Sequence, residues 1–231
     1  MDRVGDLIRF YDLLHRLEVK SGGKKLLSNC DGYLSWPKRG VYFFMEEGET
    51  RSDSGEGPRV VRVGTHAITS KSRTGLWGRL SQHRGTKGKG GNHRGSIFRK
   101  LIGYSILGKH QDCLTWGEES SASSGIRHAE EHIEQEVSAI VGKMPFLVVG
   151  IDDPPGPKSL RAVIETNSIG LLSNHEKTPL DPPSSDWLGH RCRREKVRVS
   201  GLWNQRDTDR DYDPGFLDVF ESLVEKMGTI Q

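Results

Sequence analysis

The stretch KRGVYFFMEEGETRSDSGEGPRVVRVG, residues 38–64, decides the fold of this chain. It begins with an apolar and aromatic run at residues 39–44 and ends with a β-branched run, closed by a glycine, at residues 60–64. Both runs have the composition of strands, and the acidic, Gly/Ser-rich segment between them is typical of a hairpin loop. The sequence therefore predicts a hairpin with a solvated loop from Glu46 to Pro58. A calcium loop is not favoured, because the acids lack the fixed alternate spacing that such a loop needs.

The two strands resemble the core of the GIY-YIG nuclease family, in which a Gly-x-Tyr on one strand faces an x-x-Gly on the next. Here these are Gly40-Val41-Tyr42 and Arg62-Val63-Gly64, so that Arg62 stands where the signature has its second tyrosine. The resemblance covers residues 38–175 and implies an α/β (α+β) fold, with a small, mainly antiparallel sheet and helices on its faces. We therefore expect three parts: an N-terminal helix and linker (1–37), a GIY-YIG-like nuclease domain (38–175), and a C-terminal extension packed on it (176–231).

Helical periodicity and capping residues place the other elements. Residues 6–19 carry leucines and a phenylalanine on one face, and Asp6 is the expected cap. Further helices are expected within residues 75–83, from Ser96 to 102, at 126–142 and 160–174, and from Asp213 onward. A buried strand is expected at 146–151, and residues 197–199 (Val-Arg-Val) are strand-like.

Composition limits the class of protein. The chain has 231 residues, a hydrophobic fraction of 33% and a net charge of +3, which describes a globular domain large enough for a real core. No apolar run approaches the roughly 18 residues that span a bilayer, and the first residues do not resemble a secretory signal. The three cysteines are far apart and fit neither a disulfide framework nor a zinc knuckle. We expect a cytoplasmic protein without membrane contact.

Residues 65–111 contain ten lysines and arginines and no acid. Cations without counter-charges repel one another, so this segment favours a polyphosphate partner such as DNA, with a merely solvated basic face as the alternative. Within it, Thr86–Gly95 is so rich in glycine that we expect a flexible loop that becomes ordered on nucleic acid. The candidate nucleic-acid-binding residues are His66, Arg73, Arg84, Lys87, Lys89, His93, Arg94 and Arg99.

The family resemblance extends to two further helices. Arg79 and His83 stand four apart and share a helix face, like an Arg/His pair in restriction-type members of the family. Glu165 is similar to the glutamate that holds the single metal ion, and Asn174 to the asparagine that follows it. The resemblance thus implies a catalytic set, with Glu165 binding Mg²⁺ or Mn²⁺: Tyr42, Arg62, Arg79, His83, Glu165 and Asn174.

The resemblance implies that the chain is an endodeoxyribonuclease. Tyr42 would accept a proton from the attacking water, Arg79 would neutralise charge on the phosphate, and His83 would assist the proton transfer or bind phosphate. A free tyrosine has a pKa of about 10, so nearby positive charge is needed, and Arg62, His66 or His83 could supply it. Whether Arg62 points into the site or toward the surface stays open, because the valines on both sides of it are apolar.

Two other functions remain open at this point. The missing second tyrosine motivates a DNA-binding module of the same fold that has lost catalysis. A zinc peptidase is suggested by His128-Ala129-Glu130-Glu131-His132, which fits H-x-x-E-H. The peptidase is the remote alternative: a solvated helix face explains this pentapeptide adequately, and no third ligand in a motif-like setting follows.

Overall fold

The computed structural model describes residues 2–86, 88–108 and 113–230, and its centre is a four-stranded antiparallel sheet in the order β1-β4-β2-β3. The strands are β1 (Lys25–Leu26), β2 (Gly40–Thr50), β3 (Pro58–Gly64) and β4 (Pro145–Gly150). The predicted hairpin is β2–β3 and the predicted buried strand is β4, so both are confirmed. Tyr42 pairs with Gly64 on β3 and with Val148 on β4.

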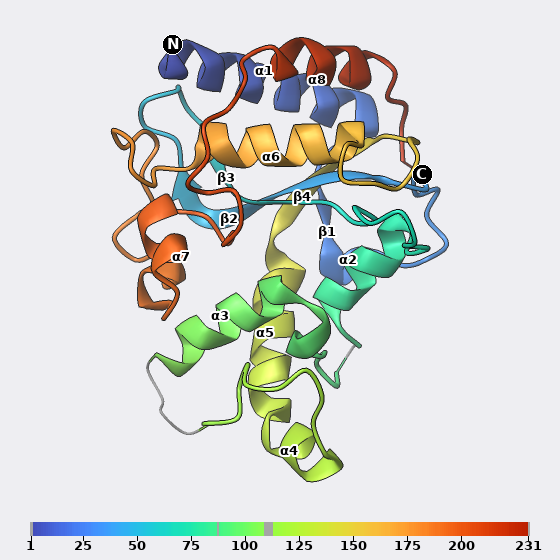
Figure 1. Cartoon of the computed structure of the whole chain (residues 1–231), viewed down its shortest axis with the longest axis vertical. Coiled ribbons are helices and arrows are strands. Elements are labelled where there is room, and N and C mark those ends of the chain that lie inside the picture. The colour runs from blue at the N-terminus through green and yellow to red at the C-terminus, as the bar shows by residue number, and fades with distance from the viewer. Residues whose placement is uncertain (1, 87, 109–112, 231) are drawn as a thin grey trace.

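Helices cover both faces of the sheet (Figure 1). Helices α1 (Arg3–Ser21), α6 (Leu160–Leu172) and α8 (Phe216–Glu225) pack on the face that carries Val41 and Phe43. Helices α2 (Leu76–Arg84), α3 (Ile97–Leu107) and α5 (Glu131–Lys143) pack on the face of Tyr42 and Phe44. This alternation along β2 follows from the two-residue period of a strand. The α+β fold is confirmed.

The free edge of β3 is closed by two residues of the C-terminal segment. The backbone N–H of Trp203 donates to the Val61 carbonyl at 2.7 Å. The side-chain amide of Asn204 accepts from the Val63 N–H at 3.2 Å and donates to the Val63 carbonyl at 2.9 Å. An uncovered edge would leave these groups free to pair with another chain. The contacts also bring the residues after Asn204 to the end of β3.

The hairpin loop is shorter than predicted, because β2 continues to Thr50 and only residues 51–57 form the turn. Two of the acids assigned to a solvated loop are instead covered by the rest of the chain. Glu49 is buried in an ion pair with Arg59, with a nitrogen–oxygen distance of 2.6 Å. Glu46 accepts hydrogen bonds from the indole N–H groups of Trp187 and Trp203 at 3.1 and 3.0 Å.

Three local predictions were wrong. Residues 197–199 lie in helix α7 (Glu195–Ser200), which is capped by Gly201 in the left-handed conformation that glycine favours. A three-residue pattern is too short to distinguish the period of a helix from that of a strand. Asp2 rather than Asp6 caps α1. The helix expected at 126–142 is divided at Glu130 into α4 (Ser124–Ala129) and α5. Glu130, at the division, is buried and pairs with Arg94.

No helix among the described residues is long and apolar enough to cross a membrane.

Candidate active site

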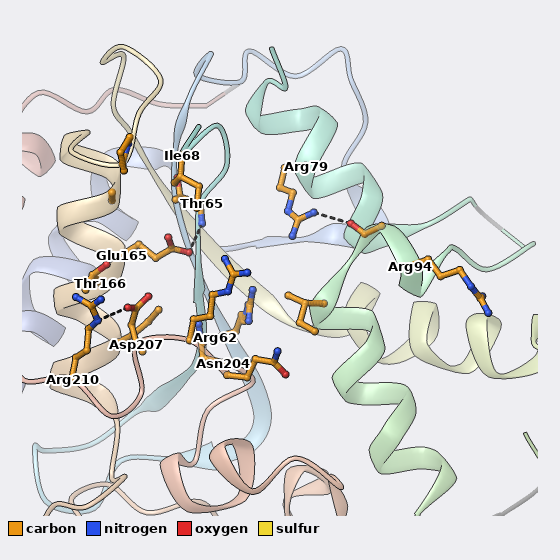
Figure 2. Close-up of a pocket in the computed structure, with 17 residues that line it drawn as sticks. Arg62, Thr65, Ile68, Arg79, Arg94, Glu165, Thr166, Asn204, Asp207 and Arg210 are labelled. Carbon is orange, nitrogen blue, oxygen red and sulfur yellow. Dashed lines mark hydrogen bonds and ion pairs between the residues drawn. The ribbon is translucent and has the colours of Figure 1, made fainter. Parts of the chain in front are cut away.

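A cavity of about 650 Å³ opens where β3 ends, and four segments of the chain form its wall (Figure 2). The segments are the end of β3, helix α2 with the turn before α3, helix α6, and residues 204–210. Its charged side chains are five arginines and two carboxylates: Arg62, Arg79, Arg94, Arg206, Arg210, Glu165 and Asp207. Arg94 is neutralised by Glu130 and Arg210 by Asp207. Arg62, Arg79 and Arg206 then still outnumber Glu165 among the described lining residues, and this excess of positive charge suits an anionic ligand.

Glu165 presents its carboxylate to the cavity from α6 (Figure 2). Ser159 begins this helix by accepting a hydrogen bond from the Ala162 N–H. Oε1 of Glu165 accepts from the backbone N–H of Thr65 at 3.0 Å, and Oε2 makes no hydrogen bond to the described residues. Burial raises the pKa of the Glu165 carboxyl, while the charge of Arg62 and the Thr65 N–H act in the opposite direction.

Arg62 is buried and directs its guanidinium toward the space between Glu165 and Arg79 (Figure 2). The side chain is fixed by a hydrogen bond from Nη1 to the Trp203 carbonyl, and it lies 5.3 Å from the centre of the Phe98 ring. The structure thus decides the orientation that the strand pattern left open. Arg62 belongs to the cavity wall and not to the outer surface.

Arg79 faces the same space from α2. Its Nη1 donates to the Gly95 carbonyl at 2.9 Å and to the Gln82 side chain at 3.0 Å. Arg62 thus reaches the cavity from β3 and Arg79 from α2, and each guanidinium is held by a backbone carbonyl.

Tyr42 lies behind this wall, fully buried, with its hydroxyl oxygen 2.8 Å from Nε2 of His83. It does not line the cavity, but its hydroxyl interacts with the Arg62 guanidinium, which does. The ring fits only because residue 64 is glycine: a Cβ there would lie 2.5 Å from atoms of the Tyr42 ring. Tyr42 and Gly64 of the two motifs are thus matched across β2 and β3.

The sequence offered Arg62, His66 or His83 as the source of positive charge near Tyr42. Neither histidine supplies it. The pKa of His83 is well below its usual value because the ring is buried and Arg79, Arg62 and Arg99 surround it. Burial and the neighbouring Arg161 lower the pKa of His66 to about 4. Both rings are neutral at neutral pH, so the positive charge beside Tyr42 is that of Arg62.

Asn174 is not brought to the cavity. Helix α6 ends at Leu172, and the Asn174 side chain binds the backbone of Leu180 and the guanidinium of Arg3. The Asn174 side chain thus links Leu180, in the C-terminal segment, to Arg3 at the start of α1. The structure therefore does not place Asn174 beside Glu165.

Three of the candidate nucleic-acid-binding residues form ion pairs with carboxylates of the protein itself. Arg99 and His93 are fully buried and both contact Glu134, at 2.5 and 2.9 Å. Arg94 makes a two-pronged ion pair with Glu130 at 2.5 and 2.9 Å. The basic segment does have counter-charges, but they come from residues 130–134, outside the window in which the acids were counted.

The remaining candidates are divided between interior and surface. His66 is buried, and Arg84 lies against the Trp77 ring while it donates to the Cys30 carbonyl. Arg73 and Lys89 are exposed. Lys87 lies outside the described residues.

Residues 205–210 were not predicted to belong to the site. Asp207 pairs with Arg210 at 2.7 Å, and the exposed Arg206 makes no hydrogen bond or ion pair with a described residue. The charged run Arg206-Asp207-Thr208-Asp209-Arg210 was visible in the sequence, but only its contact with β3 reveals that it borders a cavity.

The H-x-x-E-H pentapeptide does not form a metal centre. His128 lies in α4 and His132 in α5, and both are exposed to solvent. No group of three or more metal-ligating side chains occurs in the part of the chain that the structure describes. The solvated-face interpretation of this pentapeptide agrees with the structure.

Comparison with known proteins gives one match. A family model described as GIY-YIG domain matches residues 1–230, which includes both flanks of the segment that carries the sequence motifs. No curated protein and no solved structure matches the chain.

Proposed function

Because the chain belongs to the GIY-YIG domain family, whose members are typically endonucleases, we propose that it is a metal-dependent endonuclease that hydrolyses phosphodiester bonds in DNA. The observation that carries this proposal is the cavity at the end of β3, where the carboxylate of Glu165 faces the guanidinium groups of Arg62 and Arg79. A carboxylate for a cation and two arginines for a phosphate are the parts that this chemistry needs.

The residues fit a hard divalent cation. Glu165 has one oxygen held by the Thr65 N–H and one free toward the cavity, and Mg²⁺ is commonly bound by one or two carboxylates with water as the other ligands. Glu165 would hold the ion, Mg²⁺ or Mn²⁺. When bound, the ion supplies polarisation of the phosphate and stabilises charge on the leaving oxygen.

Arg62 and Arg79 would bind the phosphate. Their guanidinium groups are already fixed, by the Trp203 and Gly95 carbonyls, in positions that face the cavity. Donors held in place before the reaction stabilise developing negative charge without reorganisation, and removal of one such donor costs about 3 kcal/mol in comparable sites. Arginine also presents a planar fork that matches phosphate oxygens.

Tyr42 would accept the proton of the attacking water. The Arg62 guanidinium is the permanent positive charge near its hydroxyl. His83 stays neutral and contacts the same hydroxyl at 2.8 Å. In this proposal Arg62 both binds phosphate and supports Tyr42.

Nicking of supercoiled plasmid DNA tests the proposal. We expect wild-type protein to nick with Mg²⁺ or Mn²⁺, and Glu165→Gln and Tyr42→Phe each to slow nicking by about 100-fold or more. Glu136→Gln, on the exposed face of α5, serves as the matched control and should nick at the wild-type rate. Equal rates for Glu165→Gln and wild type would contradict the proposal.

Two observations favour a second function. Tyr42 does not line the cavity and the second signature tyrosine is Arg62, so a DNA-binding module without catalysis is the alternative. It predicts that wild-type protein binds duplex DNA but leaves the plasmid intact with either metal ion.

A further inference from the structure

Arg161 lies one helical turn before Glu165 on α6, so the two side chains leave the same face of the helix. Arg161 is completely buried, with an exposed fraction of 0%. Its position is unfavourable for a positive charge in two respects, because a buried guanidinium loses its hydration and because the first turn of a helix repels a cation. The contacts of the guanidinium must therefore account for a cation at this place.

The Arg161 guanidinium joins α6 to two other segments of the chain. In the turn after β4, Nε pairs with Oδ1 of Asp153 at 2.5 Å, and Nη2 donates to the Pro154 carbonyl at 3.3 Å. In the segment that follows β3, Nη1 donates to the His66 carbonyl and Nη2 to the Ala67 carbonyl at 3.5 Å. Asp153 thus supplies the counter-charge, and the two carbonyl contacts hold the segment after β3 against α6.

Thr65, immediately before these two carbonyls, connects the contact to Glu165. Its backbone N–H donates to Oε1 of Glu165 at 3.0 Å, and its hydroxyl donates to the Gly40 carbonyl on β2 at 2.7 Å. The hydroxyl fastens Thr65 to the sheet, and Arg161 fastens the two residues that follow. The direction of the Thr65 N–H is therefore fixed from both sides.

The backbone of Ala67 shows that this segment is constrained. Its φ of 55° lies in the left-handed region, which residues with a Cβ rarely adopt. Such a conformation persists where the surrounding structure imposes it, and the contact of Arg161 with the Ala67 carbonyl is of this kind. Without that contact, the segment after Thr65 can relax, and the Thr65 N–H is no longer held toward Glu165.

We propose that Arg161 is a positioning residue for Glu165. By holding the two carbonyls after Thr65, it keeps the Thr65 N–H on Oε1 of Glu165. Oε2, which has no hydrogen-bond partner among the described residues, is then left for a cation in the cavity. A ligand that is oriented before the ion arrives loses less freedom when it binds. That this cation is Mg²⁺ or Mn²⁺ rests on the proposed function.

Amide hydrogen exchange, followed by NMR on the full chain without metal or DNA, tests the contact itself. The measured quantity is the exchange rate of the Thr65 N–H divided by that of the Val63 N–H, which is bound to the Asn204 side chain instead. Arg161→Met combined with Asp153→Asn removes both charges of the buried pair and so leaves no unpaired charge. This double variant should raise the ratio about tenfold, because the hydrogen bond of the Thr65 N–H is lost.

Two further variants complete the exchange measurement. Asp153→Asn alone keeps the carbonyl contacts of Arg161 and should leave the ratio at its wild-type value. Arg161→Lys keeps the charge but lacks the planar fork, and should raise the ratio in the same direction as the double variant. A ratio that neither Arg161 variant changes, whether or not both amides exchange faster, would overturn the proposal.

The metal dependence of nicking tests the consequence for Glu165. At saturating DNA, the Mn²⁺ concentration that gives the half-maximal rate should rise about tenfold in the double variant, as when other metal ligands lose their outer support. Asp153→Asn alone should keep the wild-type Mn²⁺ requirement. A wild-type requirement in the double variant would overturn the positioning role. A wild-type protein that binds DNA but never nicks it would refute the proposed function, whereas the exchange ratio would still decide whether Arg161 positions the Thr65 N–H.

Discussion

Arg62 is the residue at which this chain departs from the family signature, and the departure replaces a hydroxyl by a permanent positive charge. A tyrosine there offers a hydroxyl, whereas arginine brings a permanent charge and several donors but no possibility of acting as a base. Burial lowers the pKa of the Arg62 guanidinium, with Tyr42 and Glu165 raising it. Even so the group stays charged, because arginine does not lose its proton in proteins. The substitution thus places a fixed cation between the two residues proposed for catalysis.

The first prediction concerns this cation. Arg62→Ala should reduce the cleavage rate by about tenfold or more, because a preorganised donor and the charge beside Tyr42 are both lost. Arg62→Lys should retain part of the rate, since lysine keeps a point charge but lacks the planar fork. Rates are measured at saturating DNA and metal ion, with thermal unfolding checked for each variant. A wild-type rate from the alanine variant would show that the site works without this position.

The second prediction concerns His66 and acid stability. Its pKa is about 4 in the folded protein and about 6.5 when unfolded. Between these values the unfolded chain binds more protons, so the contribution of a neutral His66 to stability is present at pH 7 and is lost as the pH falls. From pH 7 to pH 5 the loss is about 2 kcal/mol. Urea titrations at pH 7 and pH 5 measure the free energy of unfolding of both proteins. Between these pH values His66→Gln should lose about 2 kcal/mol less than wild type does. An equal loss in the two proteins would contradict the prediction.

At the scale of elements, the turn before α3 holds two residues of the candidate site in place. The Gly95 carbonyl holds Arg79, and Ser96 contacts His83. The turn is itself fixed by α5, since Glu130 pairs with Arg94 and Glu134 contacts the N–H of His93. Helix α5 thereby determines where two residues of the candidate site lie.

The third prediction tests this support. Glu134 is buried and binds both Arg99 and His93, so Glu134→Ala would leave the Arg99 charge buried without a partner. Such a loss costs about 3–5 kcal/mol in the free energy of unfolding. Glu136→Ala, exposed on the same helix, should change it by less than about 0.5 kcal/mol. Equal unfolding midpoints for the two variants would mean that the buried pair does not support the fold.

At the scale of the whole molecule, the C-terminal segment completes the site. Trp203 and Asn204 close the edge of β3, and residues 205–210 form the cavity wall that faces Arg79 across the opening (Figure 2). Helix α8 and helix α1 cover the same face of the sheet together (Figure 1). The C-terminal segment therefore shapes the cavity through residues 204–210, whereas α1 and α8 contribute no described residue to its lining.

The fourth prediction concerns Arg206 at this wall, which forms no ion pair with any residue that the structure describes. If it contacts a DNA phosphate, Arg206→Gln should weaken duplex binding and reduce the slope of log affinity against log salt by about 0.9. Binding is measured in the Glu165→Gln background, so that the DNA stays intact. Arg127→Gln, on the distant and exposed α4, should leave the slope unchanged. A slope that Arg206→Gln does not alter would exclude a phosphate contact there.

The sequence alone predicted the hairpin, most helices, the family and the polar residues of the two motifs, because strand alternation, helix periodicity and glycine positions are local properties. It predicted Glu165, Arg79 and Arg62 as site residues, and the structure brings these three to one cavity. It misplaced Asn174 and the buried cations at 93–99, and it did not indicate residues 205–210. Each of these depends on a partner far along the chain: Leu180 for Asn174, Glu134 for Arg99, and the edge of β3 for Asn204. A count of charges within residues 65–111 does not include a carboxylate on another helix. Only the tertiary structure therefore decided which of these cations are buried and which acid each one pairs with.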